Sequence, residues 1–183
     1  MTLSTVSKGS QPVRVAAAQF FSGTDEAANA QTCVAYMQKA KAGGAQLLVL
    51  PENSQRERDY FANGRPSRER CWECCSTVES SAFVATLAAE AARLGLYVAV
   101  GVDVRGSAKP SVHIASVLIG PDGKVVGVHR KTVLWDYEYT LFEAATDPYK
   151  VFDFETLTLT HTLIRTLALI LTIALTHFLT PES

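Results

Sequence analysis

The sequence predicts an α/β fold, and two observations lead to this class. Residues 13–20 (VRVAAAQF) and 47–50 (LLVL) are short apolar runs typical of buried strands, and the segment between them has helical periodicity. Strand, helix and buried strand in succession predict a βαβ unit with a parallel sheet. Further along, residues 113–119 and 125–129 flank a Gly-Pro-Asp-Gly turn at 120–123, which predicts an antiparallel hairpin.

The first predicted helix follows the strand at 13–20. Thr24 is the expected N-cap, and Gly43-Gly44 is the expected stop. Its predicted apolar stripe consists of Ala27, Ala30, Val34 and Met37. The polar stretch 53–70, which follows the strand at 47–50, is too long for a simple connection, so we expect a functional loop or lid there.

The second predicted helix begins with a capping box of Ser76 and Glu79 and ends at Gly95. The apolar stripe expected on it consists of Phe83, Leu87, Ala91 and Leu94. A buried strand is predicted at 96–102, and the last predicted strand spans 151–154. The resulting sheet carries helices and an antiparallel hairpin.

Composition bounds the class of protein. The chain has 183 residues, 48% hydrophobic and 19% charged, which fits one soluble globular domain, with or without an appendage, and excludes a disordered protein. The net charge of −1 gives no electrostatic reason to expect nucleic acid or an anionic membrane as a partner. The four cysteines form no disulfide framework, and the first residues lack an apolar secretory core, so the expected compartment is the cytoplasm.

Charge is distributed unevenly along the chain. Of the 17 basic and 18 acidic residues, only Arg165 and Glu182 lie within 157–183, a segment of mostly Leu, Thr and Ile. We therefore expect an N-terminal tail at 1–12, a partial domain at 13–156 and an atypical apolar tail at 157–183. The last segment has three interpretations: a membrane anchor, which Arg165 disfavours, an amphipathic helix, or a frame change or unspliced segment, which the abrupt composition shift favours.

Three charged residues are candidates for chemistry. Glu52 directly follows the strand at 47–50 and Pro51, and Lys131 directly follows the hairpin. Glu138 comes seven residues later, among the aromatic residues Trp135, Tyr137, Tyr139 and Phe142. Functional groups of open α/β sheets gather beyond the carboxyl ends of strands, so we expect Glu52 and Lys131 to meet. A carboxylate beside an ammonium can act as a base and an oxyanion partner, but strand ends are also where solvated charges normally lie.

Across residues 13–155 the sequence resembles the nitrilase superfamily of carbon–nitrogen hydrolases. The matching pieces are VRVAAAQF, AGGAQLLVLPEN with Glu52, GLYVAVGVDV, ASVLIGPDGKVVGVHRK with Lys131 and WDYEYTLF with Glu138. The resemblance implies an α-β-β-α sandwich and thiol-mediated hydrolysis of an amide, carbamoyl or nitrile bond. It implies Glu52 as the general base, Lys131 as the group that stabilises the anionic intermediate, and Glu138 as the second glutamate, which orients the lysine. The implied partner is a small amide or nitrile, with no cofactor and no metal.

The sequence departs from the family pattern at the nucleophile. The family has a cysteine a few dozen residues beyond the lysine, whereas no cysteine follows Cys75 here, and Ala144-Ala145 and Ile114 replace the usual Pro-Gly and Asn. We therefore expect an incomplete domain that is catalytically silent alone and that exposes an apolar sheet face. The alternative is a non-catalytic binding or regulatory subunit that pairs with a complete homologue, and a homo- or hetero-oligomer is left open.

The motif Cys71-x-x-Cys74-Cys75 has a different potential chemistry. A Cys-x-x-Cys pair is found in zinc and redox sites, but no second Cys/His pair stands at ligand spacing in the sequence. Packing of these cysteines at the start of the second predicted helix is the favoured interpretation.

Overall fold

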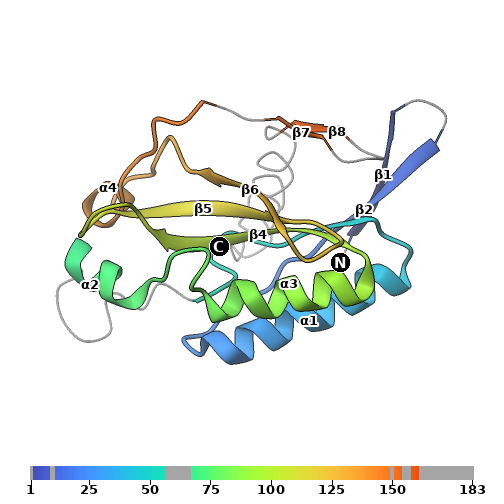
Figure 1. The fold of residues 1–183 in the computed structure, drawn as a ribbon, viewed down its shortest axis with the longest axis horizontal. Helices are drawn as coiled ribbons and strands as arrows, with labels where there is room; N and C mark the ends of the chain where they lie inside the picture. Colours follow the sequence, from blue (N-terminus) through green and yellow to red (C-terminus); the bar gives the residue numbers. More distant parts are fainter. Residues whose placement is uncertain (1, 9–10, 57–66, 149–150, 154–157, 161–183) are drawn as a thin grey trace, which may run out of the picture.

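The computed structural model describes residues 2–8, 11–56, 67–148, 151–153 and 158–160. Its elements, in chain order, are β1 (Thr2–Lys8), β2 (Gln11–Ala17), α1 (Glu26–Ala42), β3 (Leu47–Val49), α2 (Arg68–Cys74), α3 (Ala82–Leu94), β4 (Tyr97–Arg105), β5 (Val112–Ile119), β6 (Val125–Arg130), α4 (Glu138–Leu141), β7 (Val151–Asp153) and β8 (Thr158–Thr160). Strands β1 to β6 form one sheet in sequence order, and α1 and α3 cover one of its faces (Figure 1). The predicted α/β class is confirmed.

The strand pairing follows the sequence prediction in its main features. Strands β2, β3 and β4 are parallel neighbours, as the βαβ unit requires, and β5 and β6 form the predicted antiparallel hairpin. All three residues of β3 are buried, as expected for a central parallel strand. Because β3 is central and parallel to its neighbours, its carboxyl end opens at the same edge of the sheet as the ends of β2 and β4.

The N-terminal residues, assigned above to a tail at 1–12, include a strand. Thr2–Lys8 forms β1, which pairs antiparallel with β2 along its whole length. This segment has no continuous apolar run, which is why the sequence pattern gave no strand signal. Its Thr and Val residues nevertheless suit a strand, and pairing with β2 satisfies its backbone groups along one edge.

Helix α1 begins one residue later than predicted. Asp25, not Thr24, is the N-cap, and its Oδ1 accepts hydrogen bonds from the backbone N–H groups of Ala27 and Ala28 at 2.9 and 3.1 Å. The buried side of the helix is formed by Asn29, Ala30, Cys33, Met37 and Ala40. The predicted stripe was therefore partly wrong, because Ala27 is exposed and Val34 is only half-buried.

Helix α3 also begins at a different cap. Ser81 Oγ accepts a hydrogen bond from the backbone N–H of Val84 at 3.2 Å, whereas Ser76 makes a parallel bridge to Val104 and lies outside the helix. The predicted capping box was wrong for this tertiary reason: the backbone of Ser76 is paired with β4. The predicted end at Gly95 is confirmed, since Gly95 has φ 58° and ψ 50°, a left-handed conformation that favours glycine.

The polar stretch 53–70 includes part of a helix. Arg68–Cys74 forms α2, and Ser67 Oγ accepts a hydrogen bond from the backbone N–H of Arg70 at 3.3 Å. The remainder of the predicted loop at 57–66 lies outside the described residues. The same holds for residues 161–183, so the three interpretations of the C-terminal segment stay predictions.

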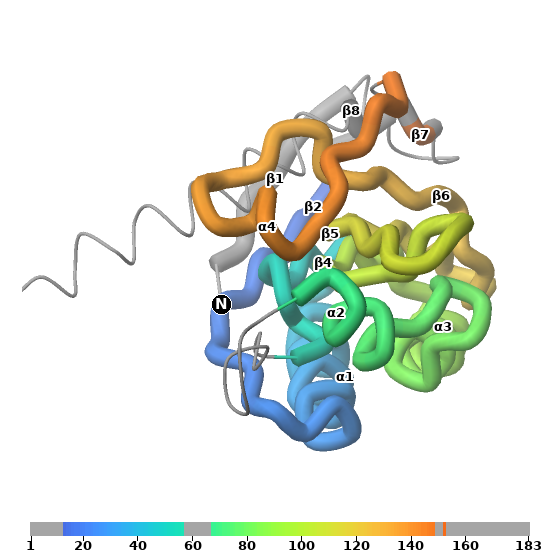
Figure 2. Tube along the Cα trace, turned by 90° about the vertical axis from the view of Figure 1, so that its left-hand side faces the viewer, coloured from blue at the N-terminus to red at the C-terminus, as the bar shows by residue number. Residues whose placement is uncertain are grey.

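The sheet has a buried apolar cluster on each face. Ala16, Leu48, Val98 and Val100 pack with α1 and α3, and side chains that alternate with them, including Val15, Leu47 and Ala99, form a second cluster on the opposite face. Phe152 of β7 packs against this second cluster, and a side chain at Gly127 would overlap the Phe152 ring. The members of the cluster are at most 3% exposed, so the prediction of an open apolar face was wrong. Figure 2 shows β7 on the side of the sheet opposite α1 and α3.

Candidate active site

Glu52 lies in a tight turn directly after β3. The backbone N–H of Gly101 in β4 donates to Pro51 O at 3.2 Å, and Gly101 O accepts from the backbone N–H of Ser54 at 3.1 Å. A Cβ at position 101 would lie 2.5 Å from Glu52 Cα, so only glycine permits this close approach. Asn53 completes the turn with φ 60°, a conformation in which Asn is enriched. The turn holds Glu52 at the carboxyl end of β3.

Lys131 follows the last residue of β6 and continues its pairing. Its backbone N–H donates to Ile114 O at 2.7 Å, and its carbonyl accepts from the backbone N–H of Ala145 at 2.9 Å. The backbone of Lys131 is therefore fixed between β5 and the segment that returns from α4. This leaves the side chain to extend toward Glu52.

The structure brings the three predicted site residues together. Lys131 Nζ lies 3.2 Å from Glu52 Oε2 and 2.9 Å from Glu138 Oε2. The exposed fractions of the side chains are 43% for Glu52, 18% for Lys131 and 5% for Glu138. The ammonium is thus shared by a buried carboxylate on one side and a more exposed carboxylate, that of Glu52, on the other.

Glu138 has a second partner that the sequence analysis did not identify. Its Oε2 accepts a hydrogen bond from the backbone N–H of Trp135 at 2.8 Å, while its backbone begins α4. A buried carboxylate needs such donors to offset its lost hydration. Backbone N–H groups carry no residue-type signal, so this contact depends on the path of residues 131–138 and could not be read from the sequence.

The aromatic residues near Glu138 divide into two groups. Phe142 is fully buried, in a cluster with Cys71, Leu134 and Leu141. Trp135 and Tyr139 are 67% and 53% exposed, and the rings of Trp135 and Tyr137 meet edge to face at 5.9 Å. Of the four predicted aromatic residues, one therefore belongs to the core and three lie on the surface.

The four cysteines lie in three environments. Cys71 and Cys75 are buried in the cluster with Phe142, and Cys74 is exposed on α2. Cys33 lies on the buried side of α1, where loss of hydration raises the pKa of its thiol to about 12, although a backbone hydrogen bond opposes the shift. A thiol is a poor nucleophile in its neutral form, so Cys33 is chemically inert near neutral pH. Among the described residues, no group of three His, Cys, Asp or Glu side chains is placed to hold a metal ion.

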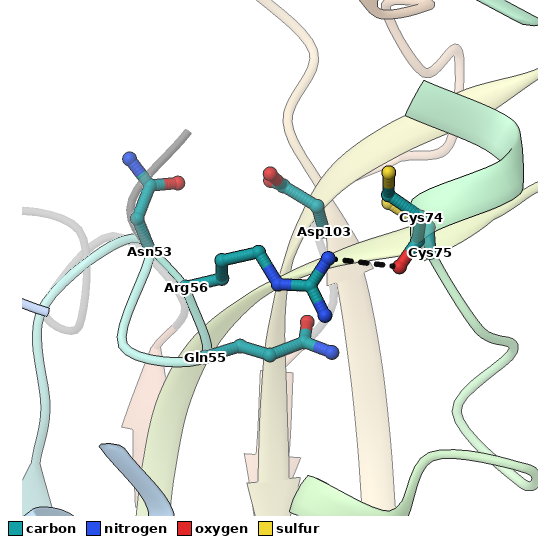
Figure 3. A pocket seen from close by; sticks show the side chains of 6 residues that line it. All are labelled: Asn53, Gln55, Arg56, Cys74, Cys75 and Asp103. Atoms are coloured by element: carbon teal, nitrogen blue, oxygen red, sulfur yellow. Dashed lines mark hydrogen bonds between the residues drawn. The ribbon is translucent and has the colours of Figure 1, made fainter. Parts of the chain in front are cut away.

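A small pocket lies between the turn that follows Glu52 and the end of α2 (Figure 3). It is lined by Asn53, Gln55, Arg56, Cys74, Cys75 and Asp103. Arg56 Nη2 pairs with Glu26 Oε2 at 3.2 Å, and Arg56 Nη1 donates to Cys74 O at 3.5 Å. Among the described residues, Asn53 Oδ1 and Arg56 Nε are buried without a hydrogen-bond partner.

The structure thus shows an α/β domain in which Glu52, Lys131 and Glu138 form a charged cluster at the carboxyl end of the parallel strands. The sequence profile of the family described as Carbon-nitrogen hydrolase matches residues 14–168. The chain therefore belongs to the carbon–nitrogen hydrolase family. The match runs past residue 156, and the domain boundaries given above stay predictions. A comparison with curated proteins found no match.

Solved structures from the nitrilase superfamily share the fold. A cysteine-to-alanine mutant of the Nesterenkonia AN1 amidase matches with a TM-score of 0.66 at 20% identity, covering 81% of this chain and 54% of that chain. The same kind of mutant in complex with butyramide matches with a TM-score of 0.67 at 19% identity, again over 81% and 54%. A glutamate-to-glutamine mutant, with acrylamide added at its active-site cysteine, matches with a TM-score of 0.67 at 20% identity, over 81% and 56%. The chain thus spans about half the length of these amidases.

The membrane-anchor interpretation was also compared with the structure. Within the described ranges, no helix combines the length and the apolar character needed to cross a bilayer. The segment 161–183, on which that interpretation depends, lies outside those ranges.

Proposed function

We propose that the chain supplies the acid–base part of an amide-type carbon–nitrogen hydrolase site. In this proposal Glu52 is the general base for a thiol, Lys131 stabilises the negative oxygen of the tetrahedral intermediate, and Glu138 orients Lys131. The observation that carries the proposal is the shared ammonium, with Lys131 Nζ at 3.2 Å from Glu52 and 2.9 Å from Glu138. Membership of the carbon–nitrogen hydrolase family supports the same reaction class.

The different burial of the two glutamates supports different roles. Glu138 is buried and holds both Lys131 and the Trp135 N–H, so it suits a fixed, charged support rather than a group that exchanges protons with a ligand. Glu52 is the more exposed partner. Its carboxylate can give up the ion pair with Lys131 and bind an incoming thiol or amide, because it would not become an unpaired buried charge. Fixed charge near a developing oxyanion is among the largest contributions to catalysis of acyl transfer.

A second part of the proposal concerns the nucleophile. Acyl transfer of this type requires a thiol beside the base, and no cysteine follows Cys75 in this sequence. We therefore propose that this chain alone binds small amides but does not hydrolyse them. The similar amidase from Nesterenkonia has been seen with butyramide, which makes butyramide a suitable probe.

The test measures butyramide binding and ammonia release separately. Binding is followed through the backbone amide signal of Trp135 in a ¹H–¹⁵N spectrum, for the natural chain, Lys131→Met and Lys124→Met. Lys124 is a matched control because it is a surface lysine that is 83% exposed and paired with Asp122. We expect saturable binding to the natural chain and to Lys124→Met, a loss of at least tenfold in Lys131→Met, and no ammonia release by any of them.

Two results would contradict this proposal in different ways. Equal binding by Lys131→Met and the natural chain would remove Lys131 from the site. Stoichiometric acylation of Cys71, Cys74 or Cys75 by an amide would show that the chain supplies its own nucleophile. The alternative of a non-catalytic subunit paired with a complete homologue, the oligomeric state and the cytoplasmic location stay predictions.

A further inference from the structure

A second polar cluster lies beside the candidate active site and takes no part in the chemistry proposed above. Arg130 ends β6 and directly precedes Lys131, and successive side chains of an extended chain point to opposite sides. Lys131 reaches Glu52 and Glu138, whereas Arg130 pairs with Asp147. Arg130 Nη2 and Nε donate to Asp147 Oδ2 at 2.6 and 2.9 Å, so one carboxylate oxygen receives two bonds from the guanidinium.

His113 of β5 joins this pair to the segment that returns from α4. Its Nδ1 lies 2.8 Å from the carbonyl oxygen of Glu143, which can only accept, so Nδ1 carries a proton. Its Nε2 faces Arg130 Nη1 at 3.5 Å and Ser111 Oγ at 3.2 Å, and Ser111 Oγ donates to Glu143 Oε2 at 2.5 Å. His113 is only 5% exposed, and its hydrogen bonds connect β5, β6 and residue 143.

Backbone hydrogen bonds close the same segment at its base. The Glu143 N–H donates to Val112 O at 2.8 Å, and the Ala145 N–H donates to Lys131 O at 2.9 Å. Residues 131–147 thus leave β6 and return alongside it as a closed loop. This loop carries Lys131, the Trp135 N–H and Glu138, which make up most of the candidate site.

We propose that Arg130, Asp147 and His113 are positioning residues that hold Lys131 and Glu138 at contact distance by closing the base of this loop. The inference rests on the proposed function for its catalytic meaning, but the positioning itself is a separate physical statement. Arg130 and Asp147 are 36% and 31% exposed, and ion pairs of this exposure contribute little to global stability. Loss of the pair should therefore loosen the loop without unfolding the sheet.

The experiment measures the loop directly in the purified chain. Two signals report on it: hydrogen exchange of the Trp135 backbone amide, which is bound to Glu138, and the side-chain ¹⁵N signal of the Lys131 ammonium, which is bound to both glutamates. In Asp147→Asn we expect exchange at Trp135 to accelerate at least tenfold and the Lys131 signal to broaden beyond detection. His113→Ala should do the same, and His113→Asn, which keeps an N–H donor for Glu143 O, should retain most of the protection.

A matched control separates positioning from the simple loss of an ion pair. Glu90→Gln breaks the Arg93–Glu90 pair of α3, whose N···O distance of 2.7 Å is close to the 2.6 Å of the Arg130–Asp147 pair. Both signals should be unchanged in this variant. The charge-swapped double variant Arg130→Asp with Asp147→Arg should restore exchange at Trp135 to within threefold of the natural rate. If Asp147→Asn does not fold, this double variant is used to test the proposal in its place.

Each outcome decides the matter. Retention of both signals, within twofold, in Asp147→Asn and in His113→Ala would overturn the proposal, as would a charge-swapped variant that folds without restoring them. Neither signal requires an amide ligand or turnover. If the variants loosen the loop as expected but the natural chain does not bind butyramide, the proposed function is refuted and the positioning role stands. If the natural chain binds butyramide but the variants leave both signals unchanged, the positioning role alone is refuted.

Discussion

At the scale of single residues, Gly101 controls the position of the candidate base. The backbone of β4 approaches the turn at Glu52 so closely that a Cβ at 101 would meet Glu52 Cα at 2.5 Å and Pro51 O at 2.6 Å. Both obstacles are backbone atoms, which cannot turn away as a flexible side chain can. The turn and the strand must therefore separate if any side chain is introduced.

We predict that Gly101→Ala lowers the free energy of unfolding by about 1–3 kcal/mol, the usual cost of overpacking, and weakens butyramide binding by displacing Glu52. Urea denaturation measures the first effect, and the Trp135 amide titration measures the second. Gly23→Ala is the control, because the nearest atom to a Cβ there is 3.9 Å away. Equal stability of the two variants would contradict the close approach.

The sequence could predict part of the site at this scale. Glu52 and Lys131 stand at the ends of strands that meet at one edge of the sheet, and their side chains do lie 3.2 Å apart. The Trp135 N–H and the Arg130–Asp147 pair could not be predicted in the same way. The first is a backbone group, and the second joins residues 17 positions apart through the path of a loop that has no periodic pattern.

At the scale of elements, the start of α3 shows how a tertiary contact overrides a local motif. Ser76 and Glu79 satisfy the capping-box pattern, yet Ser76 O accepts a hydrogen bond from the Arg105 N–H at 3.0 Å, which ties Ser76 to β4. The helix then begins at Ser81, whose Oγ is placed to accept from the third residue along. Periodicity located the helix correctly, but it could not choose between two serines five positions apart.

We predict that Ser81→Ala lowers the free energy of unfolding by about 1 kcal/mol, because the Val84 N–H loses its acceptor at a buried helix end. Ser76→Ala is the paired control and should change stability by less than about 0.5 kcal/mol, since its contribution is made by the backbone. Thermal or urea unfolding of the two variants decides between the caps. A larger loss of stability in Ser76→Ala than in Ser81→Ala would instead support Ser76 as the cap of this helix.

At the scale of the whole molecule, apolar residues are buried on both faces of the sheet, against α1 and α3 on one face and with Phe152 packed against them on the other. An open face was expected because the resemblance implied a sandwich of which this sequence holds only a part. The segment at 151–154 was predicted as a strand from its apolar character, but where it packs depends on Gly127, whose missing side chain leaves room for the Phe152 ring. Such a fit between two distant positions has no signal in a single sequence.

Global stability should fall in alkaline solution because of Cys33. Burial raises the pKa of this thiol from 9.0 to about 12 in the folded chain, so above pH 9 the unfolded chain loses a proton that the folded chain keeps. The contribution of the protonated Cys33 thiol to the free energy of unfolding is complete below pH 9 and is lost as the pH rises toward 12. Between pH 8 and pH 10 the loss from this group is about 1.4 kcal/mol.

Urea unfolding at pH 8 and pH 10 measures this dependence. The natural chain should lose about 1.4 kcal/mol more over this interval than Cys33→Ala, which has no thiol to titrate. Cys74→Ala serves as the control, because Cys74 is exposed and its removal should leave the natural pH dependence unchanged. Parallel curves for all three proteins would contradict the assigned burial of Cys33.

The sharing of one ammonium by two carboxylates has a consequence for electrical balance. Glu52, Lys131 and Glu138 together carry a formal charge of −1, so arrival of a single proton brings the group to neutrality, whereas an anion would bring it to −2. An uncharged molecule meets no such opposition. The net charge of these three groups by itself therefore opposes the approach of an anion.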